Sequence, residues 1–159
     1  MKAGPTPHLR ASTSADQAAV HELLSESNLP VADLDTAPGP RFWVTEDNGR
    51  IIAAIGFERH GSAGLLRSLV VSASQRKRGL GQELVATLER EACVAGVDLL
   101  VLLTESAESF FTHLGYAVVD RRNVSEEIKQ STEFRSLCPS SAVCMTKSLL
   151  SPSVEVLHG

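Results

Sequence analysis

The sequence is poor in aromatic residues and has no excess of basic ones. Phe, Trp and Tyr together make up 4% of its 159 residues, and the formal net charge is −4. Domains dedicated to nucleic acid are usually basic overall, and single-strand binders present aromatic rings to the bases. We therefore expect no nucleic-acid partner.

Long hydrophobic runs are absent too. Residues 99–103 form a solid apolar run, which is far shorter than the roughly 18–20 residues that span a bilayer. The N-terminal segment MKAGPTPHLR lacks the apolar stretch of a signal peptide. We therefore expect no membrane partner and a cytoplasmic location.

Cysteine is scarce, with Cys93, Cys138 and Cys144 as its three positions. This odd count has no disulfide-framework spacing, which suits a reducing compartment. Cys138 and Cys144 allow two interpretations: a site for trivalent arsenic or zinc, or one cysteine near a pocket and one in a strand. No second Cys/His pair with zinc-finger spacing accompanies them, so we predict no metal site. Cys93 is expected in the core or at its boundary.

The remaining composition is that of a folded domain. Hydrophobic residues make up 43% and charged residues 21%, which is enough for a core and argues against disorder. We expect a single domain over residues 9–150, with tails over residues 1–8 and 151–159.

Apolar spacing and turn residues predict the order of the elements. Strands are expected over residues 9–11, 65–71, 98–104, 116–119 and 142–147, and on both sides of a turn at residues 47–49. Helices are expected after a capping box at residues 14–17, from Gly81 to a C-cap at Gly96, and over residues 106–114 and 125–134. This alternation predicts an α/β domain with a mixed sheet.

The segment SASQRKRGLGQEL joins a predicted strand to a predicted helix through three basic residues and two glycines. The first amides of a helix have no helical acceptor, and the helix dipole adds positive potential there. Gly79 and Gly81 would let a phosphate approach the backbone. We predict an anionic ligand here, a pyrophosphate in particular; the alternative is a glycine turn beside a solvated basic run. The third glycine of G-x-G-x-x-G is missing, and no G-x-x-x-x-G-K-[ST] occurs.

The wider context resembles the GNAT superfamily of acetyltransferases. The R-x-x-G-x-G pattern from Arg76 to Gly81 follows the strand LLRSLVV, and TESAESFFTHLGY comes later, in the family's order. The resemblance covers residues 9–149. It implies the GNAT fold, a mixed and mostly antiparallel sheet with a V-shaped splay between two central parallel strands. It also implies an N-acetyltransferase that uses acetyl-CoA as the donor. Members of the family often dimerise, so a homodimer is one alternative for the oligomeric state.

The same resemblance implies where acetyl-CoA binds. The loop amides hold the pyrophosphate, the strand backbone pairs with the pantetheine arm, and the amide near Leu69 stabilises the oxyanion. The implied contacts are Leu69, Val70, Val71, Arg76, Lys77, Arg78, Gly79, Leu80, Gly81, Gln82, Thr104 and Phe110.

Two residues of the family's usual chemistry are missing. Many members carry a tyrosine general acid where the segment AESFF has Phe111, and an asparagine where Thr104 stands. Ser106 or a water molecule is the candidate for the missing proton donor.

Arg67 stands out because it lies in an otherwise apolar strand. If residues 61–64 form the loop, His60 faces Leu65 and Glu58 faces Arg67 on one side of the sheet. We hypothesise that Arg67 binds the acceptor's carboxylate, and that Glu58 orients it or takes the amine's proton. The alternative is a purely structural ion pair.

A narrower resemblance bears on the acceptor. LLRSLVV, LLTESAESFFTHLGY and EFRSLCPSSAVCMTKSL are similar to the acetyltransferase part of N-acetylglutamate synthase, and more similar to a subfamily associated with arsenic-resistance operons. This implies a small amino-acid-like acceptor such as a glutamate mimic, with Arg67, Ser140 and Ser141 as contacts. N-acetylglutamate synthesis, protein acetylation and a non-catalytic acyl-CoA sensor remain alternatives.

Overall fold

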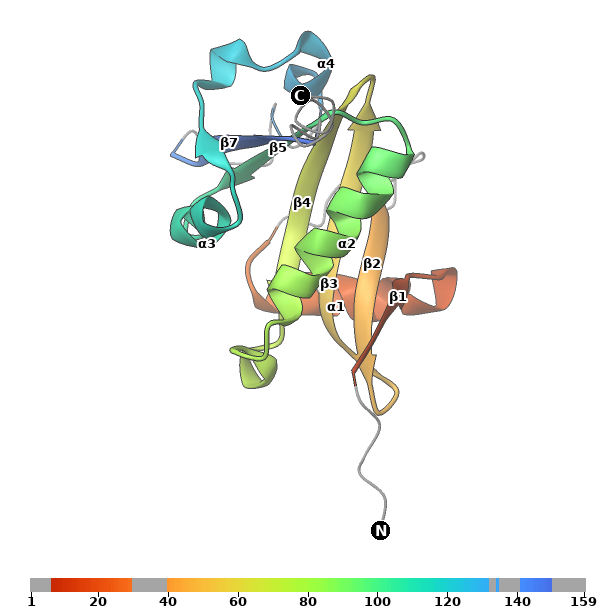
Figure 1. The fold of residues 1–159 in the computed structure, drawn as a ribbon. Coiled ribbons are helices and arrows are strands. Elements are labelled where there is room, and N and C mark those ends of the chain that lie inside the picture. Colours follow the sequence, from red (N-terminus) through yellow and green to blue (C-terminus); the bar gives the residue numbers. More distant parts are fainter. Residues whose placement is uncertain (1–6, 30–39, 132–133, 135–140, 150–159) are drawn as a thin grey trace, which may run out of the picture. The chain divides into compact units, whose positions relative to one another are not determined.

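The computed structural model describes residues 7–29, 40–131, 134 and 141–149. The strands of these residues form a seven-stranded sheet in the order β1-β2-β3-β4-β5-β7-β6 (Figure 1). β4 and β5 pair in parallel, whereas β1–β2, β2–β3, β5–β7 and β6–β7 pair antiparallel. The predicted α/β class with a mixed sheet is confirmed.

The elements occur along the chain in the predicted order. The strands are β1 (His8–Ala11), β2 (Arg41–Asp47), β3 (Arg50–His60), β4 (Ala63–Val71), β5 (Leu99–Thr104), β6 (Ala117–Val118) and β7 (Val143–Ser148). The helices are α1 (Gln17–Glu26), α2 (Leu80–Val94), α3 (Glu108–His113) and α4 (Glu126–Lys129), with 3-10 turns η1 (Ser14–Asp16), η2 (Ala73–Gln75) and η3 (Arg121–Asn123).

The chain forms two compact units, and each is described by itself. Unit 1 comprises Met1–Glu58 and Leu66–Leu88, and unit 2 comprises Arg59–Leu65 and Glu89–Gly159. The registered pairs of the parallel strands β4 and β5 join Ala63–Leu65 to Leu99–Val101 within unit 2. The V-shaped splay beyond these pairs and the two tails stay predictions.

The core of unit 1 forms between α1 and the strands. Apolar residues at helical spacing give α1 one buried face, which packs against small and branched residues of β2, β3 and β4. This cluster consists of Val20, Leu23, Leu24, Val44, Ala54 and Val70. In Figure 1, α1 passes behind these strands, and the part of α2 that belongs to unit 1 passes in front. Trp43 is also buried, and its ring centroid lies 6.5 Å from that of Phe57.

Two tight turns set the hairpins that frame β3. Asn48 and Gly49 join β2 to β3 with φ values of 54° and 76°, as the Asn-Gly pair predicts for a two-residue hairpin turn. The loop after β3 is shorter than the predicted residues 61–64. β4 already begins at Ala63, whose partner across the parallel pair is Leu99, so only Gly61 and Ser62 turn the chain.

Unit 2 has its own core on β4, β5 and β7. Its members are Ala63, Leu65, Val101, Val124, Ile128 and Cys144. Three predicted elements are shorter than expected here. The helix over 106–114 is α3, the strand over 116–119 is β6, and the helix over 125–134 is α4, with residues 132–133 outside the described part. α3 starts late because the Oγ1 of Thr104 accepts the backbone N–H of Ala107 at 2.9 Å and holds a bend before the helix.

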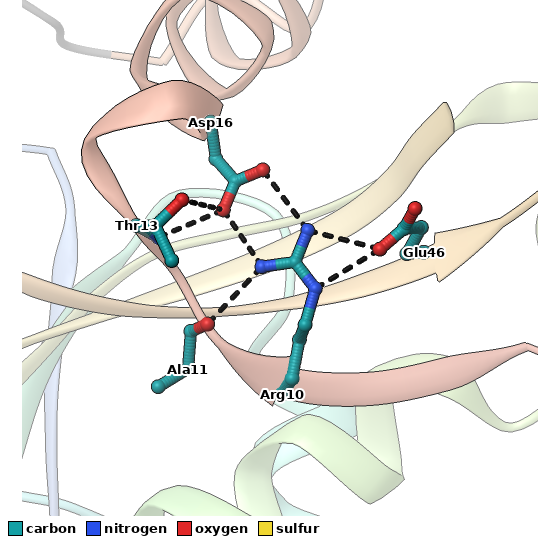
Figure 2. Close-up of polar contacts among 5 residues, drawn as sticks. All are labelled: Arg10, Ala11, Thr13, Asp16 and Glu46. Atoms are coloured by element: carbon teal, nitrogen blue, oxygen red, sulfur yellow. Dashed lines mark hydrogen bonds and ion pairs between the residues drawn. The ribbon is translucent and has the colours of Figure 1, made fainter. Parts of the chain in front are cut away.

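The predicted capping box at residues 14–17 is wrong by one position. The backbone N–H of Thr13 donates to the Oδ2 of Asp16 at 2.8 Å, so the chain turns through η1 before α1 begins. Figure 2 shows why Asp16 takes this part. Both of its oxygens also accept from the guanidinium of Arg10, at 2.7 and 3.0 Å, which the sequence pattern of a cap does not include.

Arg10 links three segments of unit 1. Its Nε donates to the Oε1 of Glu46 on β2 at 3.0 Å, and its Nη1 donates to the carbonyl oxygen of Ala11 at 3.2 Å (Figure 2). The side chain of Asp16 is only 10% exposed, against 34% for Glu46. The Arg10–Asp16 half of the network is therefore the better shielded from water.

This network predicts a loss of stability in acid. Hydrogen bonding by Arg10 lowers the pKa of Asp16 from 3.8 to about 2. The carboxylate therefore stabilises the fold above pH about 4, and the contribution is lost as the pH falls towards 2. We expect Asp16→Asn to lower the free energy of unfolding by about 2 kcal/mol at pH 7 and to match wild type near pH 2. Denaturant unfolding between pH 7 and 2 measures this difference.

A matched control for Asp16 lies at the surface of unit 2. Asp120 also pairs with an arginine, Arg122, at 2.8 Å, but its side chain is 44% exposed. Solvent screens such pairs, so Asp120→Asn should change the acid profile far less than Asp16→Asn. Parallel profiles for wild type and Asp16→Asn would contradict the assignment.

Candidate functional site

The strongest candidate site lies in unit 1, where β4 leads into α2. The first helical hydrogen bond runs from the N–H of Glu83 to the carbonyl oxygen of Gly79 at 3.1 Å, which makes Gly79 the N-cap. The amides of Leu80, Gly81 and Gln82 thus form the first turn of α2, where helix geometry supplies no acceptor. This is the anion-binding arrangement that the sequence predicts.

Gly79 supplies the backbone conformation and the open space that a phosphate needs. Its φ is 78°, a value that side-chain-bearing residues rarely adopt. Among the described residues, a Cβ built on it would meet only the Oε1 of Gln82, at 4.0 Å. Lys77 also has a positive φ, 70°, so the chain turns sharply before the helix. The residues of this loop therefore fit a pyrophosphate.

Three cations surround this helix start, as predicted. Arg76, Lys77 and Arg78 are all exposed. The Nε of Arg76 donates to the carbonyl oxygen of Val71 at 3.2 Å, so its side chain folds back over the end of β4. Arg78 contacts Gln75 and Asp47. The local charge is thus opposite in sign to that of the chain as a whole.

The predicted pantetheine strand is irregular at one residue. Ser68 has a φ of 58° within β4, which interrupts the normal alternation of the strand just before Leu69. Leu69 and Val71 are half-buried, whereas Val70 is buried against α1. No local pattern predicts this irregularity, because Ser has no preference for that conformation.

Glu58 and Arg67 do meet, as predicted. The Nη1 of Arg67 lies 2.9 Å from the Oε2 of Glu58, and its Nε donates to the Oγ of Ser68 at 3.0 Å. The side chain of Arg67 is 0% exposed and that of Glu58 16%. The predicted ion pair is therefore confirmed, and the role of Arg67 towards an acceptor stays a prediction.

The remaining predicted residues with described positions lie in unit 2. Thr104 ends β5 and caps the turn before α3, Ser106 is exposed in that turn, and Phe110 is half-buried on α3. Ser141 is exposed, and its Oγ donates to the Oε2 of Glu105 at 3.0 Å. Ser140 lies outside the described residues. Their predicted roles beside the loop of unit 1 stay predictions.

Phe111, at the position of the family's tyrosine, belongs to a buried aromatic group. Its ring packs edge-on against Phe110 and Tyr116, with centroids 5.0 and 5.4 Å apart. Tyr116 donates its hydroxyl to the Oε2 of Glu89 at 2.9 Å, and Lys147 contacts both oxygens of Glu89. The hydroxyl of Tyr116 is thus committed to Glu89. Local sequence patterns do not predict this network, because its members are far apart along the chain.

The tyrosine network predicts a late titration. Burial, and next the charge of Glu89, raise the pKa of Tyr116 above its usual value of 10.0. Because the fold favours the neutral phenol, its contribution to the stability of the fold is complete below pH about 10 and is lost at higher pH. Tyr116 is the single tyrosine of the chain. We expect its ultraviolet titration to begin only when alkaline unfolding begins; phenolate in the folded protein near pH 10 would contradict the burial.

The cysteines and the acidic residues give no metal cluster in the described part of the chain. Cys138 lies outside the described residues, and burial raises the pKa of Cys144 to about 11. Cys93 is exposed, which corrects the expectation of a core or boundary position, because it falls on the outer face of α2. Among the described residues, no three His, Cys, Asp or Glu side chains are grouped to hold a metal ion. Nor is any described helix long and apolar enough to cross a bilayer.

Two cavities in unit 1 border Asp16. One of about 270 Å³ lies beside Thr13, His21 and Phe42, and the other, of about 370 Å³, lies beside Arg10 and Glu46. Neither is lined by any residue predicted to bind acetyl-CoA. We therefore assign neither cavity to the predicted phosphate-binding loop of residues 76–81, the phosphate loop.

The family follows from a comparison with known domains. Residues 38–118, slightly more than half of the chain, match the family model of the acetyltransferase (GNAT) domain. The chain belongs to this family. The matched segment includes β2, β3, β4, the loop before α2, and α2 of this GNAT domain. No significant match was found among curated proteins.

Solved structures show the same fold at low identity. N-acetylglutamate synthase from Neisseria gonorrhoeae, solved with coenzyme A and N-acetyl-glutamate, matches with a TM-score of 0.78 and 17% identity over 92% of this chain and 36% of the synthase. A GNAT-family acetyltransferase from Staphylococcus aureus matches with a TM-score of 0.74 and 17% identity, over 91% of this chain and 99% of that protein. A Mycobacterium tuberculosis protein solved with CoA matches with a TM-score of 0.72 and 20% identity, over 90% of this chain and 99% of that protein. This GNAT domain spans only about a third of the synthase chain.

Proposed function

We propose that this GNAT domain transfers the acetyl group of acetyl-CoA to the amino group of a small amino-acid-like acceptor. The observation that carries the proposal is the loop before α2. It combines a glycine at positive φ, open space over that glycine, the first-turn amides of a fifteen-residue helix and three exposed cations. A pyrophosphate is the ligand that uses all of these groups together. Structural neighbours solved with coenzyme A support the same donor.

The chain's own groups would then serve three tasks. The loop amides and Arg76, Lys77 and Arg78 would hold the pyrophosphate, and the backbone near Leu69 would supply a donor for the oxyanion. The amine nitrogen would bond to the thioester carbon as the C–S bond breaks, and the amine would lose a proton to Glu58 or to water. The leaving thiolate would take a proton from solvent or from Ser106, because Phe111 has no hydroxyl and that of Tyr116 donates to Glu89.

The acceptor class rests on Arg67. A guanidinium binds a carboxylate through two parallel hydrogen bonds, so an amino acid or a mimic of glutamate is the acceptor that fits it. The shared motifs support an acceptor of the arsenic-resistance type, and the motifs together with the synthase's fold support N-acetylglutamate synthesis as the alternative. Arg67 already pairs with Glu58 and its side chain is 0% exposed. The acceptor must therefore share the guanidinium with the ion pair, and the groups that cover Arg67 must move to admit it.

A non-catalytic acyl-CoA sensor is the second candidate. Phe111 at the usual tyrosine position favours it, since the family's common general acid is absent. The phosphate loop would be equally necessary in a sensor. The two functions differ only in turnover.

Chromatographic detection of free CoA tests the proposal. The protein is incubated with acetyl-CoA and with glutamate, other amino acids, glutamate mimics or polyamines. We expect acceptor-dependent CoA release with an amino-acid-like member of the panel. Thermal stabilisation by acetyl-CoA without release from any acceptor would favour the sensor, and no stabilisation at all would refute donor binding.

A further inference from the structure

Asp47 connects the tip of the β2–β3 hairpin to the phosphate loop of unit 1. It is the last residue of β2, directly before the Asn48–Gly49 turn. Its Oδ2 lies 3.7 Å from the Nη1 of Arg78, and the same Nη1 also donates to the Oε1 of Gln75. The guanidinium of Arg78 is therefore held from two sides.

The hairpin itself does not require a carboxylate at this position. The positive φ values of the turn belong to Asn48 and Gly49, whereas Asp47 is an ordinary strand residue paired with Arg50. Its side chain is 18% exposed, and its buried Oδ1 has no hydrogen-bond partner among the described residues. A buried oxygen without a partner destabilises a fold. The carboxylate of Asp47 therefore destabilises the hairpin. The charged group that it contacts is the guanidinium of Arg78 in the loop.

We propose that Asp47 is a positioning residue for Arg78 and through it for the phosphates of the acetyl donor. The proposal rests on the proposed function, in which this loop binds acetyl-CoA. Arg78 keeps 41% of its side chain exposed, so an anion can reach it while Asp47 limits its rotamers. A cationic side chain that is already held loses less conformational freedom when the anion binds.

Removing the carboxylate of Asp47 changes the affinity for CoA in opposite directions for a positioning role and for simple charge repulsion. Asp47 also repels phosphates, so a carboxylate without a positioning role would weaken binding, and its removal would tighten it. If Asp47 positions Arg78, its removal weakens binding instead. The effect must then depend on the presence of Arg78.

A double-mutant cycle tests this with the full chain. CoA affinity is measured by calorimetry for wild type, Asp47→Asn, Arg78→Gln and the double variant. We expect Asp47→Asn to raise the Kd for CoA about three- to tenfold and to have no further effect beside Arg78→Gln. In turnover, the same variant should raise the KM for acetyl-CoA and leave kcat unchanged, which separates binding from a general loss of active protein.

Glu46→Gln is the matched control, because it removes one carboxylate from the adjacent position of β2 that pairs with Arg10 rather than the loop. It should leave the Kd for CoA unchanged. Tighter binding by Asp47→Asn, or an equal change in both Arg78 backgrounds, overturns the inference while CoA binding by wild type still supports the proposed function. If wild type does not bind CoA, both fail together.

Discussion

Replacing Gly79 with alanine is expected to weaken CoA binding by at least about tenfold, equivalent to 1.4 kcal/mol or more. The residue has a φ of 78°, so alanine there is strained by about 1–2 kcal/mol. A Cβ would also occupy the open space over the helix start, where the proposed pyrophosphate approaches the backbone. Calorimetry with CoA and thermal unfolding of the same samples separate the loss of affinity from the loss of stability.

Gly96 offers the matched control at the other end of α2. Its φ is 92°, and a Cβ there would make only ordinary contact with Arg59 at 3.6 Å. Gly96→Ala should therefore lose a similar amount of stability and keep its affinity for CoA. Equal affinity losses in both variants would mean that backbone strain alone is responsible, and the phosphate role of Gly79 would be lost.

Breaking the Glu58–Arg67 pair should give the largest change in stability. The guanidinium of Arg67 is fully buried and the carboxylate lies 2.9 Å from it, so either single replacement leaves a charge with poor access to water. We expect Arg67→Met and Glu58→Gln each to lower the free energy of unfolding by about 3–5 kcal/mol. Denaturant unfolding followed by Trp43 fluorescence measures this loss.

The double variant Glu58→Leu/Arg67→Met separates stability from acceptor binding. Replacing a buried pair with apolar side chains of similar size is often close to neutral, so we expect stability to recover. If Arg67 binds the acceptor's carboxylate, the acceptor KM should remain at least about tenfold above wild type. A normal acceptor KM in a stable double variant would leave the pair with a structural role only.

Local signals in the sequence were sufficient for most of the fold. Asn48 and Gly49 specify a hairpin turn because both residues adopt positive φ values. Gly96 ends α2 because it also adopts a positive φ, which a helix does not continue through. These features depend on neighbours along the chain. The phosphate loop is of the same kind, because strand, glycines, cations and helix start are contiguous from Leu69 to Gln82.

Features that depend on distant partners were missed or misplaced. Asp16 replaces the predicted cap because Arg10 reaches it from β1, and no cap pattern contains that arginine. The Tyr116–Glu89–Lys147 network joins three elements, so no window of sequence reveals it. Glu58 and Arg67 form the predicted contact. The cross-strand register behind that prediction assumed a loop over residues 61–64, whereas only Gly61 and Ser62 separate the two strands.

The chain carries one natural optical probe in each compact unit. Trp43 is its single tryptophan and is buried in unit 1, whereas Tyr116 is its single tyrosine and is buried in unit 2. Tryptophan emission and tyrosine absorbance can therefore follow the two units separately without any label. If the units unfold as one cooperative structure, the two signals share a midpoint; if each unit melts alone, the midpoints differ.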